Sequence, residues 1–480
     1  MRSCWFYLFV LFSLTSCVSY YGIHGNSTPL TVSTLLVNHH YTVPARQIAL
    51  NWWDGFHDPQ LSRLIMLALM DSPNMHSAEA RVRQAQHLAE GSVAPLLPSL
   101  DFSAYFQREK FPQFGLIPPP FNGKIFNISD VGVNFNYNFD IWGKNRQILA
   151  ATVNEQCATE ADLAEARLVI STTVANTYFE LLNNIAQVAI AKDNLRQSQQ
   201  ILKIVSERAN KGIESAIPVQ YALVNMQTAR LTVEQFKQAE NLARNQLAVL
   251  SGKNPLATKI STRDMVYKHY RISLPKSLTA NVLARRPDIT AAKFRVEAAA
   301  HSINAAKAGF FPNFNLTALF SYQSVLQNRL FEVGSQDNFV TGAIDLPIFD
   351  AGRRRANLGV KYAEYDLAIG YYNQTILTAL REVADQLAIL YAINSQIDMQ
   401  QNVLYATEQN YKLFMLRYHH GIINIMELLE YKQLLLKQQA IYHNLQTRHL
   451  QTVVTTLKAL GGQVQFRFQP ARLFSDLPKS

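Results

Sequence analysis

Cysteine is scarce in this sequence of 480 residues, which contains three. Cys4 and Cys17 lie near the N-terminus, and only Cys157 lies in the body of the chain. A single thiol cannot form an intramolecular disulfide, and it cannot supply the cysteine set of a metal site. The body of the chain must therefore fold without disulfides and without a cysteine-bound metal.

The sequence also lacks the signatures of several enzyme classes. It contains no nucleophile elbow, phosphate-binding loop or dinucleotide-binding glycine motif. Its formal net charge is +10, but the longest basic block is the run Arg353–Arg355. Such scattered charge suits a solvated surface, or a weak attraction to anionic lipid headgroups, better than a nucleic-acid site. We expect no catalysis, no cofactor, no metal and no nucleic-acid partner.

Long apolar runs are missing as well, apart from a short one at the N-terminus. The segment Met1–Cys17 has an early arginine, an apolar run over 5–12 and small residues before Cys17. It is too short for a membrane-spanning helix and is typical of a secretory signal. Its last four residues resemble a bacterial lipobox, which predicts cleavage and acylation at Cys17, although Ser16 replaces the more frequent Ala or Gly. An ordinary signal peptide with an incidental cysteine is the alternative.

No linker rich in Pro, Gly or Ser divides the chain, and an internal repeat organises it instead. ARVRQAQ and PLLPSLDFSA in the first half match KFRVEAA and GFFPNFNLTA in the second, and the Arg81 to Pro98 spacing equals that from Arg295 to Pro312. The predicted segments are a signal peptide at 1–17, an N-terminal extension at 18–60, repeats at 60–255 and 275–463, and a C-terminal tail at 464–480.

Each repeat holds two segments with the period of a β-strand. In Val131–Phe139, the clearest of them, five apolar residues alternate with Gly and Asn. One face of this strand is therefore apolar and the other polar. About nine residues also suffice for a tilted strand to cross a bilayer. The predicted strands lie at about 101–108, 131–139, 315–324 and 339–346.

Four strands per chain are too few for a barrel, and an open sheet edge is not tolerated in lipid. Two chains would supply about eight strands, whose interior is filled by side chains. Three chains would supply about twelve, an even number within the range of outer-membrane barrels. The sequence therefore predicts a homotrimer that shares one twelve-stranded barrel.

Apolar residues recur every seven positions after each strand pair, which is the pattern of a coiled-coil seam. No Pro or Gly interrupts about 146–210, so a continuous helix there would be on the order of 95 Å long. We predict long helices at about 146–210 and 355–420. The alternative, a helical bundle in a soluble protein, does not explain the strands. The heptad positions are Val174, Leu181, Val188, Leu195, Leu202 and Ala209, then Val383, Leu390, Ile397, Leu404, Tyr411 and Tyr418.

The far ends of these helices are duplicated too. Gly212 and Gly421 suit C-terminal caps, and Ser215 and Asn424 occupy matching positions as N-caps of the returning helices. This tip lies farthest from the strands along the chain. We expect it at the periplasmic end, where it closes the tunnel.

Six segments of the chain resemble signature segments of outer-membrane efflux proteins of the TolC superfamily, in the lipoprotein branch that includes OprM and the NodT-like proteins. The resemblance covers nearly the whole mature chain and keeps the order and spacing of the segments. These are NWWDGFHDPQL at 51–61, FDIWGKNR at 139–146, ARRPDITAA at 284–292, AAKAGFFPNFNL at 305–316, LPIFDAGRRRA at 346–356 and RYHHGIINIMELLE at 417–430.

The resemblance implies a mainly α-helical fold with a transmembrane β-barrel portion. A TolC-like duplicated unit would supply four β-strands per chain to a shared 12-stranded trimeric barrel, and long helices to a coiled-coil α-barrel. Such proteins stand in the outer membrane, extend into the periplasm and are lipid-anchored. They receive substrates from an inner-membrane transporter of the RND or ABC type through a periplasmic adaptor protein.

The same resemblance suggests a periplasmic gate at Met426, Glu427 and Glu430. Carboxylates around a narrow three-fold axis repel one another and attract cations, which makes a selective constriction. Here Glu replaces the Asp that is more usual in the family. Each residue also has an alternative role. Glu427 could form a capping box with Asn424, and Glu430 could lie on a solvated helix face. Met426 could pack against a neighbouring helix.

Three functions are compatible with this sequence. The first is an exit channel for drugs or other small molecules, which the lipobox and the Arg-Arg-Pro-Asp segment at 285–288 favour. The second is the exit duct of a type I protein secretion system, which uses the same scaffold. The third is a non-conducting, lipid-anchored envelope protein, which predicts neither ion conduction nor a trimer.

Overall fold

The computed structural model describes residues 19–30, 51–256, 270–273, 286–462 and 467–470. The predicted signal peptide with Cys17 lies outside these residues, as does most of the predicted C-terminal tail. The chain divides into two compact units. The first comprises 1–29, 81–160 and 291–373, and the second comprises 30–80, 161–290 and 374–480.

Helices and strands alternate in an order that repeats once along the chain. The α-helices are α3 (Pro59–Asp71), α4 (Pro73–Gly91), α5 (Lys144–Asn210), α6 (Ala216–Leu250), α8 (Pro287–Ala308), α9 (Arg353–His419) and α10 (Ile425–Ala459). The strands are β1 (Ser99–Lys110), β2 (Ile125–Phe139), β3 (Tyr270–Ser273), β4 (Asn313–Ser324), β5 (Gln336–Asp345) and β6 (Arg467–Pro470). Short 3-10 helices are η1 (Trp52–Phe56), η2 (Ala94–Leu96), η3 (Gln327–Arg329) and η4 (Val333–Ser335).

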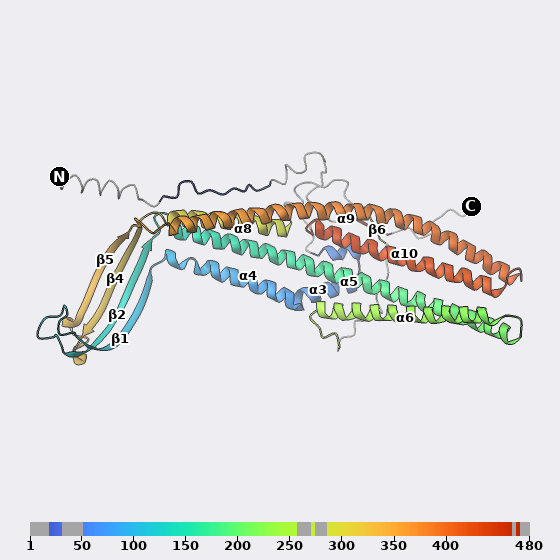
Figure 1. Cartoon of the computed structure of the whole chain (residues 1–480), viewed down its shortest axis with the longest axis horizontal. Helices are drawn as coiled ribbons and strands as arrows, with labels where there is room; N and C mark the ends of the chain where they lie inside the picture. The colour runs from blue at the N-terminus through green and yellow to red at the C-terminus, as the bar shows by residue number, and fades with distance from the viewer. Residues whose placement is uncertain (1–18, 31–50, 257–269, 274–285, 463–466, 471–480) are drawn as a thin grey trace. The chain divides into compact units, whose positions relative to one another are not determined.

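A four-stranded antiparallel sheet is the main β-structure of the first unit. Its strand order is β1-β2-β4-β5 (Figure 1). The central pair, β2 and β4, comes from the two different repeats, so the duplication is joined through the middle of one sheet. Four strands in this sheet confirm the number that the alternating patterns predicted.

The two repeats have helices of equal length. α5 and α9 each have 67 residues, and α6 and α10 each have 35. At 1.5 Å per residue, each long helix extends about 100 Å. Each begins in the first unit and ends in the second. The first heptad positions, such as Val174, Leu181 and Leu390, are fully buried, while those nearer the helix ends are half-buried or exposed.

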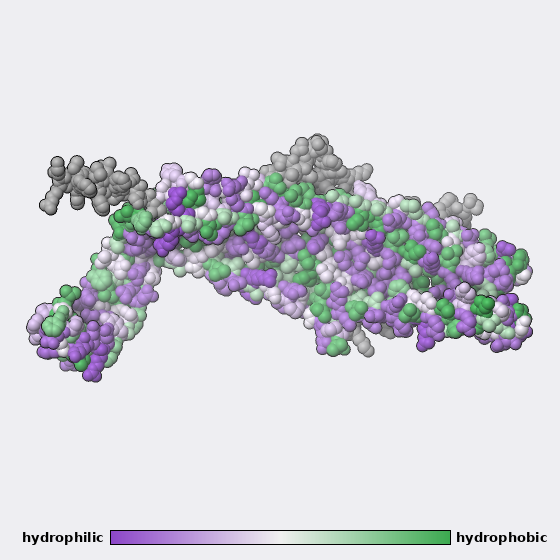
Figure 2. Space-filling model, viewed as in Figure 1, coloured by the Kyte–Doolittle hydropathy of each residue, from purple (hydrophilic) through white to green (hydrophobic). Residues whose placement is uncertain are grey.

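Polar and apolar side chains are mixed on the surfaces of the long helices (Figure 2). Among the described helices, none has both the length and the apolar character needed to span a membrane.

In the second unit, α10 packs between the two long helices. The Gln187 side chain on α5 donates a hydrogen bond to the Ala440 carbonyl at 2.8 Å. From α9, Gln386 accepts a bond from the Thr455 hydroxyl at 2.7 Å. Buried apolar residues of α10, including Val453 and Leu457, fill the space between these polar contacts. The helix is thereby held on two sides within one chain.

Candidate pore surfaces and gate

The register of the sheet separates apolar from polar side chains. Because side chains alternate across a strand, the partners of the apolar β2 positions lie on the same face as those positions. This apolar face carries Leu100, Phe102 and Ala104 of β1, Val131, Val133, Phe135, Tyr137 and Phe139 of β2, Phe314, Leu316, Ala318, Phe320 and Tyr322 of β4, and Gln336, Asn338, Val340, Gly342 and Ile344 of β5. Apart from Gln336 and Asn338 at the start of β5, these residues are apolar or glycine, so the alternation seen in β2 extends to its neighbours.

Large side chains on the apolar face are uncovered within the chain. The exposed fraction is 70% for Phe102, 57% for Phe320, 67% for Val340 and 69% for Ile344. A monomeric soluble protein rarely exposes so continuous an apolar patch. This face therefore needs an apolar environment outside the chain.

The opposite face is polar and its charges are all acidic. Its middle positions carry Asn134, Asn136 and Asn138 from β2 beside Asn315 and Thr317 from β4. The acidic residues on this face are Asp101 and Glu109 of β1, Asp130 of β2, and Asp337 and Asp345 of β5. The strands place no Lys or Arg there. Such a face suits contact with water better than a packed core.

An aspartate marks each transition from strand to long helix. The Asp140 carboxylate accepts hydrogen bonds from the backbone N–H groups of Asn145 and Arg146, each at 2.9 Å. In the second repeat, Asp350 accepts a bond from the Arg354 guanidinium at 2.8 Å. Burial raises the pKa of Asp350, but the bonds from Arg354 and Gly352 outweigh it, so the pKa lies below its usual value. Both carboxylates satisfy first-turn donors and thereby fix where the helices begin.

The helix ends farthest from the strands have the capping that the sequence predicted. Gly212 and Gly421 have φ of +68° and +70°. The N–H of Ile213 bonds to the Arg208 carbonyl at 2.9 Å, and the N–H of Ile422 to the Arg417 carbonyl at 2.8 Å. These are the bonds of a Schellman motif, repeated in both hairpins.

One of the two predicted N-caps lacks its side-chain bond. Asn424 accepts a hydrogen bond from the Glu427 N–H at 3.1 Å, whereas the Ser215 side chain makes no capping bond. The reason is Pro218, which stands where Glu427 stands in the second repeat and has no N–H to donate. Both residues therefore occupy the predicted N-cap position, but only the Asn424 side chain makes the capping hydrogen bond.

The predicted gate residues lie on the first turns of α10. Met426 and Glu427 are half-buried, and Glu430 is exposed. The Glu427 carboxylate accepts a bond from the Asn424 side chain at 2.9 Å, which completes a reciprocal cap. In the described part of the chain, the Glu430 side chain makes no hydrogen bond or ion pair. Of the two carboxylates at the predicted gate, Glu430 is thus the one without a partner in the described part of the chain.

Sequence reasoning gave no role to a buried charge network in the second unit. Arg286 is 5% exposed. Its guanidinium donates to both oxygens of Asp288 at 3.0 and 2.8 Å, to Glu382 at 2.9 Å and to the Ala459 carbonyl at 2.7 Å. Burial raises the pKa of Glu165 nearby, and the charge of Asp288 adds to this effect. The proline that follows Arg286 marks a helix start in the sequence. It could not predict the network, because the partners Glu382 and Ala459 are far from Arg286 in the sequence.

Metal binding has no support in the described residues. No group of three or more His, Cys, Asp or Glu side chains there has the arrangement of a metal site. The described free cysteine, Cys157, is half-buried, and burial raises the pKa of its thiol.

A buried histidine predicts an acid sensitivity of the fold. His449 on α10 is 4% exposed, and burial lowers its pKa to about 4. Between that value and an unfolded pKa of about 6.5, the unfolded chain binds more protons than the folded one. We expect the free energy of unfolding to fall by about 3 kcal/mol as the pH drops from 7 to 4.

Urea unfolding at a series of pH values measures this effect. His449→Gln should remove most of the slope, whereas His87→Gln, at an exposed histidine, should leave it unchanged. A His449→Gln protein with the wild-type slope would contradict the assignment.

A family model and several known proteins match this chain over most of its length. The model of the family described as outer membrane efflux protein matches residues 64–253 and 278–462. The chain is 28% identical over 419 residues to the multidrug resistance outer membrane protein MdtQ of Escherichia coli, covering 86% of this chain and 87% of that protein. It is 30% identical over 424 residues to the toluene efflux pump outer membrane protein TtgF of Pseudomonas putida, covering 88% and 87%.

A solved structure shares the fold. The CmeC outer membrane channel of Campylobacter jejuni superimposes with a TM-score of 0.83 at 23% sequence identity, over 92% of this chain and 95% of that one. The duplicated arrangement of strands and long helices described above is therefore the fold of that solved structure.

Proposed function

The chain belongs to the outer membrane efflux protein family, and from this premise we propose that it is the outer-membrane exit channel of a tripartite efflux system. The observation that carries the proposal is the sheet, which has an uncovered apolar face and a polar, acidic face. A membrane pore needs both: one face contacts lipid and the other contacts water. In this role the protein conducts and does no catalysis.

The two edges of the sheet support a trimer. Among the described residues, β1 and β5 each pair with another strand on one side only. They run in opposite directions, so β5 of one chain can pair antiparallel with β1 of the next. Unpaired edges are not tolerated in lipid, and three chains close a barrel of about twelve strands. We propose that each homotrimer forms one pore in this way.

The N-terminal segment supports lipidation at Cys17. Arg355, in the first turn of α9, donates hydrogen bonds to the carbonyls of Ser19 and Tyr21. Asp366 accepts bonds from the N–H groups of Asn26 and Ser27, each at 3.0 Å. These contacts hold Ser19 close to the strand-to-helix transition, next to the predicted membrane boundary. We propose that 1–17 holds the signal peptide with its lipobox, that cleavage leaves Cys17 at the new N-terminus, and that Cys17 is acylated.

The names of two relatives support a proposal about the cargo. MdtQ is named for multidrug resistance and TtgF for toluene efflux. We propose drugs or other small molecules as cargo for this channel. An inner-membrane transporter of the RND or ABC type would supply the cargo through a periplasmic adaptor protein.

Planar-bilayer recording on the purified full-length protein tests the channel. We expect stable conductance steps of uniform size, each from the insertion of one trimer. A protein that is monomeric and gives no conductance would be a lipid-anchored envelope protein instead, and the proposal would fail.

The gate makes a sharper prediction. We propose that Met426, Glu427 and Glu430 line the constriction, with Glu430 as the principal carboxylate because no described residue bonds to it. Glu430→Ala should raise conductance and weaken block by divalent cations severalfold, since it removes three charges from a narrow axis. Glu430→Ala combined with Glu427→Ala should have a larger effect.

Glu234→Ala is the matched control, because Glu234 forms an exposed ion pair with Lys237 on α6. Conductance and divalent block that stay at wild-type values in both gate variants would reject this placement of the ring.

A further inference from the structure

The four-stranded sheet carries its positive charges in one place. Among its strands, β1 alone contains Arg or Lys, and these are Arg108 and Lys110 near the end of the strand. This end lies away from the start of α5, and the segment 111–124 joins β1 to β2 there (Figure 1). We call Arg108 and Lys110 the rim pair, and this end of the sheet the outer rim.

The rim pair lies on the same side of the sheet as the apolar face. Phe102 belongs to the apolar face, and Arg108 and Lys110 lie an even number of positions after it in the same strand. Alternate side chains of a strand point to one side of the sheet. The two cations therefore continue the line of apolar side chains that begins at Leu100.

No acid of the strands neutralises the rim pair. The acidic residues of the sheet all lie on the polar face. Glu109 stands between the two cations in the sequence, but it lies on that other face, where it accepts a hydrogen bond from the Gln107 side chain at 3.0 Å. Both cations are exposed, and in the described part of the chain their side chains make no hydrogen bond or ion pair. The strands of an identical neighbouring chain would add no acid to this side either.

The rim pair is compact enough to bind one phosphate group. Positions i and i+2 of a strand are about 7 Å apart, and the two side chains are long. Asn127 lies directly opposite Arg108 on β2, where the side chains start about 5 Å apart, and Asn127 is exposed. Arg and Lys bind phosphate oxygens through short, charge-assisted hydrogen bonds. Together these residues offer two cations for a phosphate and an amide for a neighbouring hydroxyl group.

The rim pair lies where a continuous apolar surface gives way to polar side chains. Phe106, which is 60% exposed, precedes the pair on this side of β1. On β2 the change is from Val131 to Ser129 and Asn127, with Ile125 as a last apolar residue beyond them. Cations on the lipid face of a barrel are costly at the midplane and tolerated near the interfaces. With the long helices in the periplasm, the outer rim is the headgroup boundary of the outer leaflet.

Protection of a free sheet edge does not explain these charges. Charged residues on an exposed edge strand often prevent unwanted pairing. In a closed barrel, however, β1 gains a partner on its open side and has no free edge. The rim pair then faces lipid headgroups.

We propose that the rim pair binds a phosphate of a phosphorylated glycolipid in the outer leaflet, an acylated disaccharide that carries phosphate monoesters. This inference rests on the proposed function, which places the apolar face in the outer membrane. A phosphate monoester carries about −1.5 to −2 charges at pH 7, which two adjacent cations match. A zwitterionic headgroup fits less well, because its ammonium finds no acid on this side of the strands. Asn127 would bond a sugar hydroxyl, and the acyl chains would lie along the apolar side chains of β1.

Native mass spectrometry of the purified full-length protein tests the proposal. The probes are lipid A with its phosphates and the same lipid after dephosphorylation. We expect the wild type to retain the phosphorylated form at least tenfold better. Arg108→Gln and Lys110→Gln should each reduce that retention about tenfold, the size expected for one charge-assisted hydrogen bond. Both variants should retain the dephosphorylated form as the wild type does.

Lys124→Gln is the matched control, because Lys124 is an exposed lysine at the same outer rim. Its carbonyl accepts a hydrogen bond from the Phe111 N–H at 2.9 Å, which extends the ladder between β1 and β2 by one residue. Alternation then places its side chain on the polar side of the sheet. This variant removes the same charge and should retain phosphorylated lipid A like the wild type.

Two results would overturn the proposal. The first is equal retention of the two forms of lipid A by the wild type, or rim-pair variants that retain the phosphorylated form as well as Lys124→Gln does. The second is a wild type that retains phosphatidylglycerol as well as phosphorylated lipid A, because the rim pair would then attract any anionic lipid.

Conductance recorded on the same preparations separates this inference from the proposed function. Rim-pair variants that conduct normally but lose phosphorylated lipid A support the site. A conducting wild type without the lipid preference rejects the site alone, and a wild type that does not conduct rejects the channel.

Discussion

Arg286→Ala is expected to lower the free energy of unfolding of each chain by about 3–5 kcal/mol, the cost of removing one partner from a buried ion pair. Arg286 is buried and connects the start of α8 with α9 through Glu382 and with the end of α10 through the Ala459 carbonyl. Its loss leaves a buried carbonyl and the Asp288 carboxylate without their donor. Glu165 loses a neighbouring positive charge at the same time.

Urea unfolding in detergent, followed by tryptophan fluorescence, measures this change. Arg381→Ala is the matched control, because Arg381 forms an exposed pair with Asp385 on the same helix as Glu382, and it should cost less than about 1 kcal/mol. Arg286→Lys keeps the charge but loses the bidentate bond to Asp288, so it should fall between the two. If Arg286→Ala unfolds at the same urea concentration as Arg381→Ala, the network does not stabilise the second unit.

Phe320→Arg is expected to cost about 2–4 kcal/mol per chain in a bilayer, the penalty for a cation on the lipid face of a barrel near its midplane. Phe320 pairs with Val133 in the middle of the apolar face and is 57% exposed within the chain. Three copies per trimer would multiply the effect. Assembly of heat-resistant trimers in lipid vesicles, judged by electrophoresis, should therefore fail or fall steeply.

The neighbouring residue provides the matched control. Leu319 is also apolar, but it pairs with Asn134 and lies on the polar face. Leu319→Arg places the same charge one residue away, on the side that faces water, so trimers should still assemble. If the two variants assemble equally well, or if Leu319→Arg is the worse of the two, the faces have been assigned the wrong way round.

The strands and the repeat could be predicted because they depend on local patterns. Val131–Phe139 alternates so regularly that only a strand with unlike faces fits it. The equal spacing in the two halves fixed the duplication, and the observed helices of 67 and 35 residues repeat in both halves. Gly212 and Gly421 predicted the positions of both hairpin turns, because glycine adopts a positive φ without strain.

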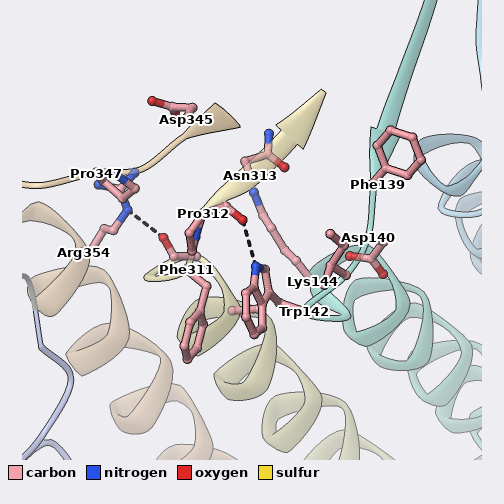
Figure 3. A pocket seen from close by; sticks show the side chains of 13 residues that line it. Phe139, Asp140, Trp142, Lys144, Phe311, Pro312, Asn313, Asp345, Pro347 and Arg354 are labelled. Atoms are coloured by element: carbon pink, nitrogen blue, oxygen red, sulfur yellow. Dashed lines mark hydrogen bonds between the residues drawn. The ribbon is translucent and has the colours of Figure 1, made fainter. Parts of the chain in front are cut away.

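Other features could not be predicted, because they depend on contacts between residues that are far apart in the sequence. Ser215 and Asn424 look equivalent as caps, but the donor that each needs lies three residues on, where Pro218 replaces Glu427. No periodic pattern in the sequence predicts that Arg286 donates a hydrogen bond to Glu382, 96 residues away. The cavity lined by 139–144, 308–313 and 345–354 likewise joins three segments that are far apart in the chain (Figure 3).

The strands, the long helices, their duplication and the family could all be inferred from residue spacing, because each depends on short-range patterns within one stretch of chain. Which alternating residues share a face, and which charges are left unpaired, became known only from the folded chain. Strand register and the burial of charge depend on segments brought together by folding, so they follow from the free energy of the whole chain and from no single stretch of it.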